Sequence, residues 1–237
     1  MNTYIQTTLE ERGHTVSHID PKQFTLLEKP HFGYGPGKSP LELQTVQTTL
    51  ARADAYVCIT PEYNHSPSPA LMNVLNHFGS STFSFKPSAI GKCTRILQIP
   101  IEPTFIKCAL TYIKQHVSDS LFQVTYSAGQ WGGTRAGVAL RTTLSELGCL
   151  PVSAMIHIPK AQEVLNRDGN IATKSSEENN GETDDDEEET DRWRKYCARC
   201  FSQLEWWAVA AQNHREVVDP FDVSPAFTQA PSERNAP

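Results

Sequence analysis

The sequence predicts an α/β protein in which a parallel sheet is covered by helices on both faces. Three observations lead to this fold class. Strand-like runs alternate with helical segments through much of the 237 residues. The run over 55–60 is almost wholly apolar, as expected of a strand buried on both faces. The length suits one domain with a complete core.

The first elements follow from periodicity. Tyr4, Ile5 and Leu9 recur at helical spacing, and an alternating run follows Gly13, a plausible helix cap. The remaining elements follow from similar patterns and from glycine and proline positions. The predicted order is a helix over 2–12, a strand over 14–20, a loop over 30–40, a helix over 41–53, a strand over 55–60, a helix over 70–78, a strand over 124–127, a helix over 134–147 capped by Gly148, and a strand over 151–158.

The last part of the chain divides into three. An acidic run over 175–191 is predicted to be a solvated, mobile excursion, with a regulatory or partner-binding role as the alternative. The segment 192–216 is predicted to be helical, and residues 217–237 are expected to form a disordered tail after a domain over 1–216. The expected apolar face of the last helix consists of Trp193, Tyr196, Cys200, Leu204, Trp207 and Ala211.

The net charge of -6 is concentrated in the acidic run. Removing the ten negative charges of that run leaves a net charge of +4 for the rest of the chain. This mild positive charge suits an anionic cofactor and is too weak to indicate nucleic acid. No apolar stretch reaches the roughly 18–20 residues of a membrane helix, and the first residues lack the layout of a signal peptide. We therefore expect a soluble, cytoplasmic protein.

The six cysteines do not form an obvious functional pattern. An even number would permit three disulfides, but the chain is large and shows no secretory signal. Cys58 lies in the apolar run and is expected to fill the core. Cys197 and Cys200 form a C-x-x-C pair without a second pair at zinc-site spacing. Packing on one helical face is the favoured interpretation of this pair, with a metal or redox role as the alternative.

Two loops follow predicted strands at the position where open parallel sheets bind ligands. The first begins after Thr60 and the second after Tyr126. Glycines in the second loop would let the backbone approach a planar ligand, and Tyr63 and Trp131 offer flat aromatic faces. The pattern is compatible with a flavin site, and also with two tight turns whose aromatic side chains close the rim of the sheet.

The same residues resemble a known family. The stretch Thr60-Pro61-Glu62-Tyr63-Asn64, with Ser66 and a helix from Pro69, is similar to the signature of NADPH-dependent FMN reductases and related quinone reductases. The stretch from Tyr126 to Arg135 resembles the second flavin loop of that family. Segments 158–161, 168–170 and 203–207 resemble its usual ending.

This resemblance implies a flavodoxin-like enzyme that binds FMN and takes hydride from NADPH or NADH. The acceptors would be free flavin, quinones, azo dyes or metal ions, and a homodimer would be expected, with a partner that helps to wall the flavin. No catalytic side chain and no metal are implied, because the cofactor carries the chemistry. The implied cofactor-binding residues are Pro61, Glu62, Tyr63, Asn64, Ser66, Ser127, Ala128, Gly129, Gln130, Trp131, Gly132 and Gly133. Asn73 and Asn76 would brace the first loop or lie on the surface.

The chain departs from this family in two places. Its sequence opens inside the expected first helix, so that the first strand and the glycine- and serine-rich phosphate loop are expected to be missing. An insertion over 91–123 carries a strand-like run over 96–101 and a predicted helix over 105–122. One explanation is a gene model that omits an upstream exon and retains extra sequence. The alternative is an elaboration in which the run over 96–101 fills the vacant strand position.

Three outcomes follow for function. The favoured one is an FMN-dependent NAD(P)H oxidoreductase, which would be yellow when it holds its cofactor. The second is a non-catalytic relative that has lost FMN binding and acts through protein partners. The third is a chain that does not fold stably.

Overall fold

The computed structural model describes residues 2–21, 24, 29–93, 109–114, 124–126, 130–166, 170–171 and 184–224. The described strands form one mixed sheet in the order β1-β5-β2-β6-β8-β4-β7, and β3 pairs with β2. The strands are β1 (Thr15–Ile19), β2 (Tyr56–Tyr63), β3 (Ser66–Pro67), β4 (Pro87–Cys93), β5 (Ala109–Lys114), β6 (Val124–Tyr126), β7 (Leu150–Pro151) and β8 (Ile156–Ile158). The helices are α1 (Asn2–Glu11), η2 (His31–Gly33), α2 (Leu41–Ala51), α3 (Pro69–His77), α4 (Ser80–Phe83), α5 (Thr134–Glu146), α6 (Ala161–Val164), α8 (Asp184–Arg215) and α9 (Pro220–Val223).

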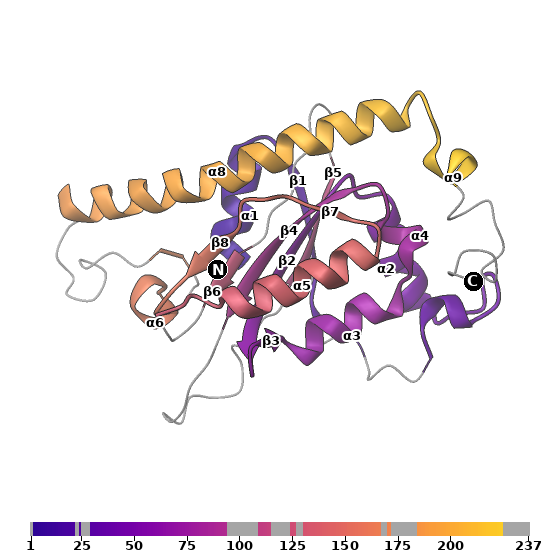
Figure 1. Ribbon diagram of the computed structural model, residues 1–237, viewed down its shortest axis with the longest axis horizontal. Helices are drawn as coiled ribbons and strands as arrows, with labels where there is room; N and C mark the ends of the chain where they lie inside the picture. The colour runs from indigo at the N-terminus through magenta and orange to yellow at the C-terminus, as the bar shows by residue number, and fades with distance from the viewer. Residues whose placement is uncertain are drawn as a thin grey trace.

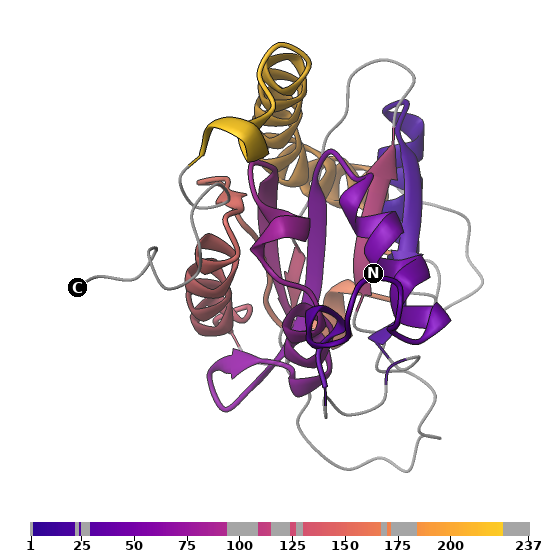
Figure 2. The same ribbon diagram turned by 90° about the vertical axis from the view of Figure 1, so that its right-hand side faces the viewer.

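The prediction of an α/β fold with helices on both faces of the sheet is confirmed. Figure 1 shows α8 along one side of the sheet and α3 and α5 along the other, and both α5 and α8 contact β4. Figure 2 shows the sheet between α5 and α1. The core between these layers is built from apolar side chains of β2, α3 and α8. Among the described residues, no helix is long and apolar enough to cross a bilayer.

Strand β5 comes from the inserted segment and lies between β1 and β2. It is antiparallel to both, pairing over Thr15–Ile19 on one side and Tyr56–Cys58 on the other. In a sheet of the order 2-1-3-4-5 this is the place of the first strand. Backbone groups of β1 and β2 that would otherwise lack partners are thereby paired.

The sequence prediction for the insertion is wrong in part. A helix was expected over 105–122, but residues 109–114 form a strand. Thr111, Tyr112 and Ile113 are residue types that favour strands, and the pairing available on both sides decides the conformation. The run over 96–101, proposed as the strand that fills the vacancy, lies outside the described residues.

Strands β4 and β6 lie on opposite edges of β2, because both pair with Ile59 and Thr60, and on opposite edges of β8, because both pair with Ile156. Each pairs in parallel with β2 and in parallel with β8. The four strands therefore close into a small ring at the carboxyl ends of β2 and β4. Most of the inserted segment lies between β4 and β6 in the sequence, and yet both strands pair with β2 and with β8.

The strand predicted over 151–158 is interrupted. It forms β7 and β8, separated by four residues. In this gap the backbone N–H of Ala154 donates to Oε1 of Gln203 at 2.9 Å, and the Ser153 hydroxyl donates to the same oxygen at 2.9 Å. A side chain of α8 therefore satisfies a backbone group that a continuous strand would have paired.

The acidic run was predicted to be mobile, and this is wrong over 184–191, which forms the first turns of α8. Carboxylates are favourable at the amino end of a helix because they oppose the positive end of its dipole. Asp191 also accepts from Lys195 at 2.6 Å, one turn later. The rest of the run, 175–183, lies outside the described residues.

The prediction of a disordered tail after residue 216 is likewise wrong over 220–223, where α9 forms. The Asp219 side chain caps this helix.

The helix predicted over 192–216 is confirmed, but its buried face is rotated from the predicted one. The fully buried side chains are Cys197, Cys200, Phe201, Leu204 and Ala208. Trp207, which was expected on this face, is 42% exposed. It makes an edge contact with Trp206, with ring centroids 4.7 Å apart. The second apolar side of α8 is therefore at the surface.

Lys86 is a buried cation just before the start of β4. Its Nζ donates to the carbonyl oxygens of Ala51 at 2.7 Å, Leu50 at 3.2 Å and Thr82 at 3.3 Å. It also contacts the Tyr56 hydroxyl at 3.0 Å. The first two carbonyls belong to the last turn of α2, where the helix dipole attracts a positive charge. Burial nevertheless lowers the pKa of Lys86 to about 8, with nearby Arg215 acting in the same direction.

This lowered pKa predicts a specific pH dependence of stability. The unfolded chain keeps the Lys86 proton up to its ordinary pKa of 10.5, whereas the folded chain loses it near 8. The unfolded state therefore binds more protons between these values, so the contribution of Lys86 to stability rises with pH across this window. The free energy of unfolding of the wild type, minus that of Lys86→Met, should increase by up to about 3 kcal/mol from below pH 8 to pH 10.5.

Urea unfolding of both proteins across this pH range checks the prediction. Buried cysteines such as Cys149 have raised pKa values that act in the opposite direction in both proteins, and the difference between the proteins reports Lys86 together with its effect on the pKa of Cys149. A difference that stays constant with pH would show that Lys86 does not titrate as its burial indicates.

Candidate functional site

The two loops singled out in the sequence emerge at the same edge of the sheet. Strands β2, β6 and β8 run parallel, so their carboxyl ends share one edge. The first segment continues from β2, and the second follows β6 and leads into α5. Helix α5 lies against β3, which brings the two segments together. This is the edge where open parallel sheets bind ligands.

The first segment is a hairpin rather than a loop from its first residue. Pro61, Glu62 and Tyr63 are the last residues of β2, so the expectation that the strand ends at Thr60 is wrong. Tyr63 pairs with Ser66 of β3 across a two-residue turn. Both turn residues, Asn64 and His65, have positive φ angles, of 49° and 62°. This is the conformation of the tightest hairpin turns.

The hairpin is anchored at its base by hydroxyl groups. The backbone N–H of Ser68 donates to the Thr60 hydroxyl at 2.9 Å, and the two hydroxyls lie 3.1 Å apart. The Ser68 side chain also caps α3 by accepting from the N–H of Leu71. Strand β2, the turn and the start of α3 therefore form one rigid unit.

The predicted residues of this segment differ in how far they are buried. Pro61 and Glu62 are buried, Tyr63 is half-buried, and Asn64 and Ser66 are exposed. The Glu62 carboxylate lies 3.9 Å from Nε2 of His65. The side chains that a ligand can reach from this segment are thus those near the turn.

The second segment is held by hydrogen bonds from the first residue of α5. Ser127, Ala128 and Gly129 lie outside the described residues. Gln130 is exposed and Trp131 is 65% exposed, whereas Gly132 and Gly133 are buried with φ angles of 53° and 83°. The Thr134 hydroxyl and backbone N–H both donate to the carbonyl of Trp131, at 2.8 and 3.1 Å.

Gly132 cannot carry a side chain without displacing its neighbours. An added Cβ would lie 3.0 Å from the backbone nitrogen of Pro159 and 3.1 Å from Cβ of His157. These atoms are not the ends of flexible side chains, so the loop would have to move. The geometry therefore holds the backbone against the end of β8 and leaves the indole of Trp131 outside.

His157 and Pro159 were not among the predicted site residues. The N–H of His157 donates to the Tyr196 hydroxyl of α8 at 3.0 Å, which fixes the strand that supports Gly132. Lys160, which follows Pro159, has a positive φ of 46°, and its ammonium group pairs with the Glu163 carboxylate at 3.0 Å. Neither its residue type nor its spacing indicates a role for His157, because that role depends on a contact with Gly132, which is distant in the sequence. Of the two asparagines on α3, Asn76 is exposed and Asn73 is half-buried.

The amino end of α1 lies at the same edge of the sheet. Helix α1 leads through a short turn into the amino end of β1, and β1 runs in the direction of β2 because both are antiparallel to β5. The helix therefore begins at the carboxyl edge, and Figure 1 shows the amino end of the chain beside β6 and β8. The first N–H groups of a helix carry partial positive charge and attract anions.

Four cysteines pack in the core, as predicted for Cys58 and for the C-x-x-C pair. Cys58, Cys149, Cys197 and Cys200 are buried and unbridged. Burial raises the pKa of Cys149 and of Cys197 to about 12, so neither thiol ionises appreciably at neutral pH. Among the residues that the structure describes, no cluster of His, Cys, Asp and Glu could hold a metal ion.

The structure is a layered α/β sheet with the two segments at its carboxyl edge, which is where open parallel sheets that bind nucleotides or flavins hold them. Comparison with known families narrows this class. The family model of NADPH-dependent FMN reductases matches residues 1–163. The chain belongs to this family.

Solved structures show more distant similarity. One is an oxidoreductase from Corynebacterium diphtheriae, with 12% identity and a TM-score of 0.42 over 72% of this chain. The chain spans 64% of that protein's length. Another is FerB, a flavoenzyme NAD(P)H:(acceptor) oxidoreductase from Paracoccus denitrificans. It has 17% identity and a TM-score of 0.40, over 73% of this chain and 78% of FerB.

Proposed function

We propose that this chain is an FMN-dependent NAD(P)H oxidoreductase whose flavin ring lies between the β2–β3 hairpin and the loop before α5. The observation that carries the proposal is the shape of that loop. Gly132 is pressed against the end of β8, and Trp131 beside it is exposed. A backbone held this way offers N–H groups to a planar ring, and the indole offers it an apolar wall.

The residues present fit the two parts of FMN. Tyr63, Asn64 and Ser66 are accessible on the hairpin, and Gln130 and Trp131 on the facing loop, so these would contact the ring. The amino end of α1 would receive the phosphate, as helix amino ends do in many nucleotide sites. When bound, FMN supplies the hydride-accepting ring, and the protein supplies position and electrostatics. No side chain of this chain is required to act as an acid or base.

Free flavins and quinones are the proposed acceptors. The exposed indole of Trp131 would stack on a flat aromatic acceptor that enters at the same edge. Either NADPH or NADH would serve as the hydride donor. We also propose that the protein acts in the cytoplasm.

Titration of the cofactor-free protein with FMN and with riboflavin tests this proposal. Both should bind and quench flavin fluorescence, because the loops contact the ring that the two share. A helix amino end contributes up to about 2 kcal/mol to anion binding, so FMN should bind no more than roughly 30-fold tighter than riboflavin. Addition of NADPH and a quinone should then produce steady NADPH oxidation.

The possible outcomes separate the alternatives. A folded protein that binds neither flavin would contradict the proposal and support the non-catalytic relative that acts through partners. Circular dichroism and thermal unfolding of the same sample establish that the chain is folded. Binding of FMN with no NADPH oxidation would leave the site assignment intact and contradict the reductase activity.

A further inference from the structure

His65 carries an exposed imidazole at the tip of the β2–β3 hairpin, and it was not among the predicted site residues. Its side chain is 65% exposed, and its Nε2 lies 3.9 Å from the carboxylate of Glu62. The Glu62 side chain is only 11% exposed, and a buried carboxylate attracts a positive charge, which an imidazole can carry near neutral pH. Among the residues that the structure describes, none bonds Nδ1 of His65. One ring nitrogen therefore faces a carboxylate, and the other is available to a ligand.

The backbone at His65 has a conformation that glycine prefers. His65 is the second residue of the two-residue turn, and its φ angle is 62°. Asparagine followed by glycine is the favoured pair in such turns, and the first position here is Asn64. A residue with a side chain costs stability at the second position. Residues that keep such a conformation are concentrated at functional sites, so the cost points to a use for the imidazole.

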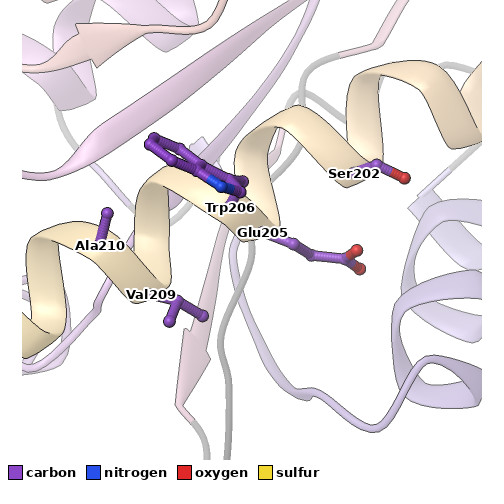
Figure 3. Close-up of a pocket in the computed structure, with 5 residues that line it drawn as sticks. All are labelled: Ser202, Glu205, Trp206, Val209 and Ala210. Carbon is purple, nitrogen blue, oxygen red and sulfur yellow. The ribbon is translucent and has the colours of Figure 1, made fainter.

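Another contact between a histidine and a glutamate shows what distinguishes His65. Nε2 of His14 lies 3.2 Å from the Glu205 carboxylate, but the His14 side chain is only 2% exposed. Glu205 also accepts from Nε of Arg12 at 2.6 Å. Glu205 lines a surface hollow on α8, together with Ser202, Trp206, Val209 and Ala210 (Figure 3). The His14 contact therefore joins α8 to the start of β1 and offers no imidazole to a ligand, whereas His65 is exposed at the carboxyl edge of the sheet.

We propose that His65 is a catalytic residue that donates a proton to a quinone acceptor, with Glu62 as its positioning residue. The inference rests on the proposed function, because it needs a quinone at the edge where the hairpin lies. Conversion of a quinone to its hydroquinone adds one hydride and one proton. With the hydride supplied by the cofactor, the proton leaves Nδ1 of the His65 imidazolium and forms a bond to the quinone oxygen that becomes negative.

The contact with Glu62 suits this step before and after the transfer. The imidazolium has a proton on both nitrogens, and the neutral ring that remains keeps the proton on Nε2, which faces the carboxylate. Because His65 is exposed, it can regain its proton from water. Water could also protonate the quinone directly, so the reaction does not require His65. A positioned imidazolium makes the transfer faster.

Anaerobic stopped-flow oxidation of the FMN-loaded protein, reduced with one equivalent of dithionite, tests the proposal. The oxidant is either tetramethyl-1,4-benzoquinone or ferricyanide, which accepts electrons and no proton. His65→Asn should slow oxidation by the quinone at least about tenfold, the lower range for loss of a general acid, and leave oxidation by ferricyanide unchanged. His214→Asn, the same change at an exposed histidine near the end of α8, should alter neither rate.

His65→Gly separates proton donation from folding. Glycine suits the φ angle of 62°, so the midpoint of urea unfolding should rise, while oxidation by the quinone slows as it does in His65→Asn. A slower reaction in a more stable protein cannot result from unfolding. Imidazole added to this variant should restore part of the rate with the quinone and leave the rate with ferricyanide unchanged.

Binding of the product gives a readout without turnover. Tetramethylhydroquinone added to the oxidised FMN-loaded protein should shift the ¹⁵N resonance of Nδ1 of His65 more than that of Nε2, because Nδ1 lies beside the bound hydroxyl. Loss of both resonances in His65→Asn identifies them.

Three results would overturn the inference. The first is an equal rate with the quinone in the wild type and in His65→Asn. The second is equal slowing with both oxidants, which would make His65 part of the flavin site and not a proton donor. The third is a pair of His65 resonances that saturating hydroquinone leaves in place. Failure of NADPH to reduce the bound FMN contradicts only the proposed reductase activity, because dithionite reduces the protein in this experiment, whereas a chain that binds no FMN would overturn both.

Discussion

Gly132→Val should weaken FMN binding by at least about tenfold. The new Cβ would meet the backbone of Pro159 at 3.0 Å and Cβ of His157 at 3.1 Å, so the loop must shift away from β8. A branched side chain is also strained at the observed φ of 53°. Losing one backbone hydrogen bond to the ring costs about 1.5 kcal/mol, which corresponds to the expected factor. Fluorescence titration measures it.

Gly37→Val is the matched control. Gly37 has a similar φ of 66°, and an added Cβ there meets nothing within 4 Å. The two variants therefore share the backbone strain and differ in the contact with β8. We expect Gly37→Val to lower stability without changing FMN affinity. Equal FMN affinity in Gly132→Val and Gly37→Val would show that the loop before α5 is not part of the flavin site.

Gly148→Ala should destabilise the protein by about 3 kcal/mol. Gly148 follows α5 with a φ of 79°, which costs an alanine about 1–2 kcal/mol. The added Cβ would also lie 2.0 Å from Oγ of Ser84 and 2.8 Å from its Cβ, and relieving such an overlap costs a further 1–3 kcal/mol or so. The measurement is the free energy of unfolding in urea.

Two further variants separate strain from overlap. Gly13→Ala introduces the same strain, at a φ of 91°, with nothing within 4 Å of the new Cβ, so it should cost only about 1 kcal/mol. Adding Ser84→Gly to Gly148→Ala removes the overlapping atoms and should recover about 1 kcal/mol or more. If Gly148→Ala were no worse than Gly13→Ala, the close packing of Ser84, which follows α4, against the end of α5 would be contradicted.

Much of the fold followed from the sequence because local pattern and tertiary structure agree there. The helix at the amino end, strand β1, the apolar strand from Tyr56 and helix α5 lie within a few residues of their predicted bounds. In these segments the apolar spacing matches the element that buries it. Gly148 caps α5 as expected, with a left-handed conformation that glycine adopts at little cost.

The errors arose where long-range contacts decide the structure. Residues 109–114 are a strand because β1 and β2 offer unpaired backbone on both sides, and no local pattern reports that vacancy. The strand predicted over 151–158 breaks because Gln203, 49 residues away from Ala154, takes its N–H. The face of α8 was misjudged because Trp207 fits the periodicity, while Phe201 and Ala208 fill the core.

The residue types of the candidate site were predictable from the sequence, whereas its backbone conformation and supporting contacts were predictable only in part. Glycines and aromatic residues after two strands pointed to a planar ligand, and the two segments do lie at one edge. The sequence did not reveal that Pro61 and Glu62 are buried strand residues. It also did not reveal that His157 and Pro159 hold Gly132 in place. The ligand-binding role of these residues remains a prediction.

The central claim is that this chain positions FMN to accept hydride from NADPH. Anaerobic mixing of the FMN-loaded protein with NADPH tests it most directly, because it involves no acceptor. We predict that the visible absorption of the bound flavin bleaches on mixing, faster than that of the same concentration of free FMN, and returns when air is admitted. Bound FMN whose absorption NADPH leaves unchanged, or bleaches no faster than it does free FMN, would contradict the claim.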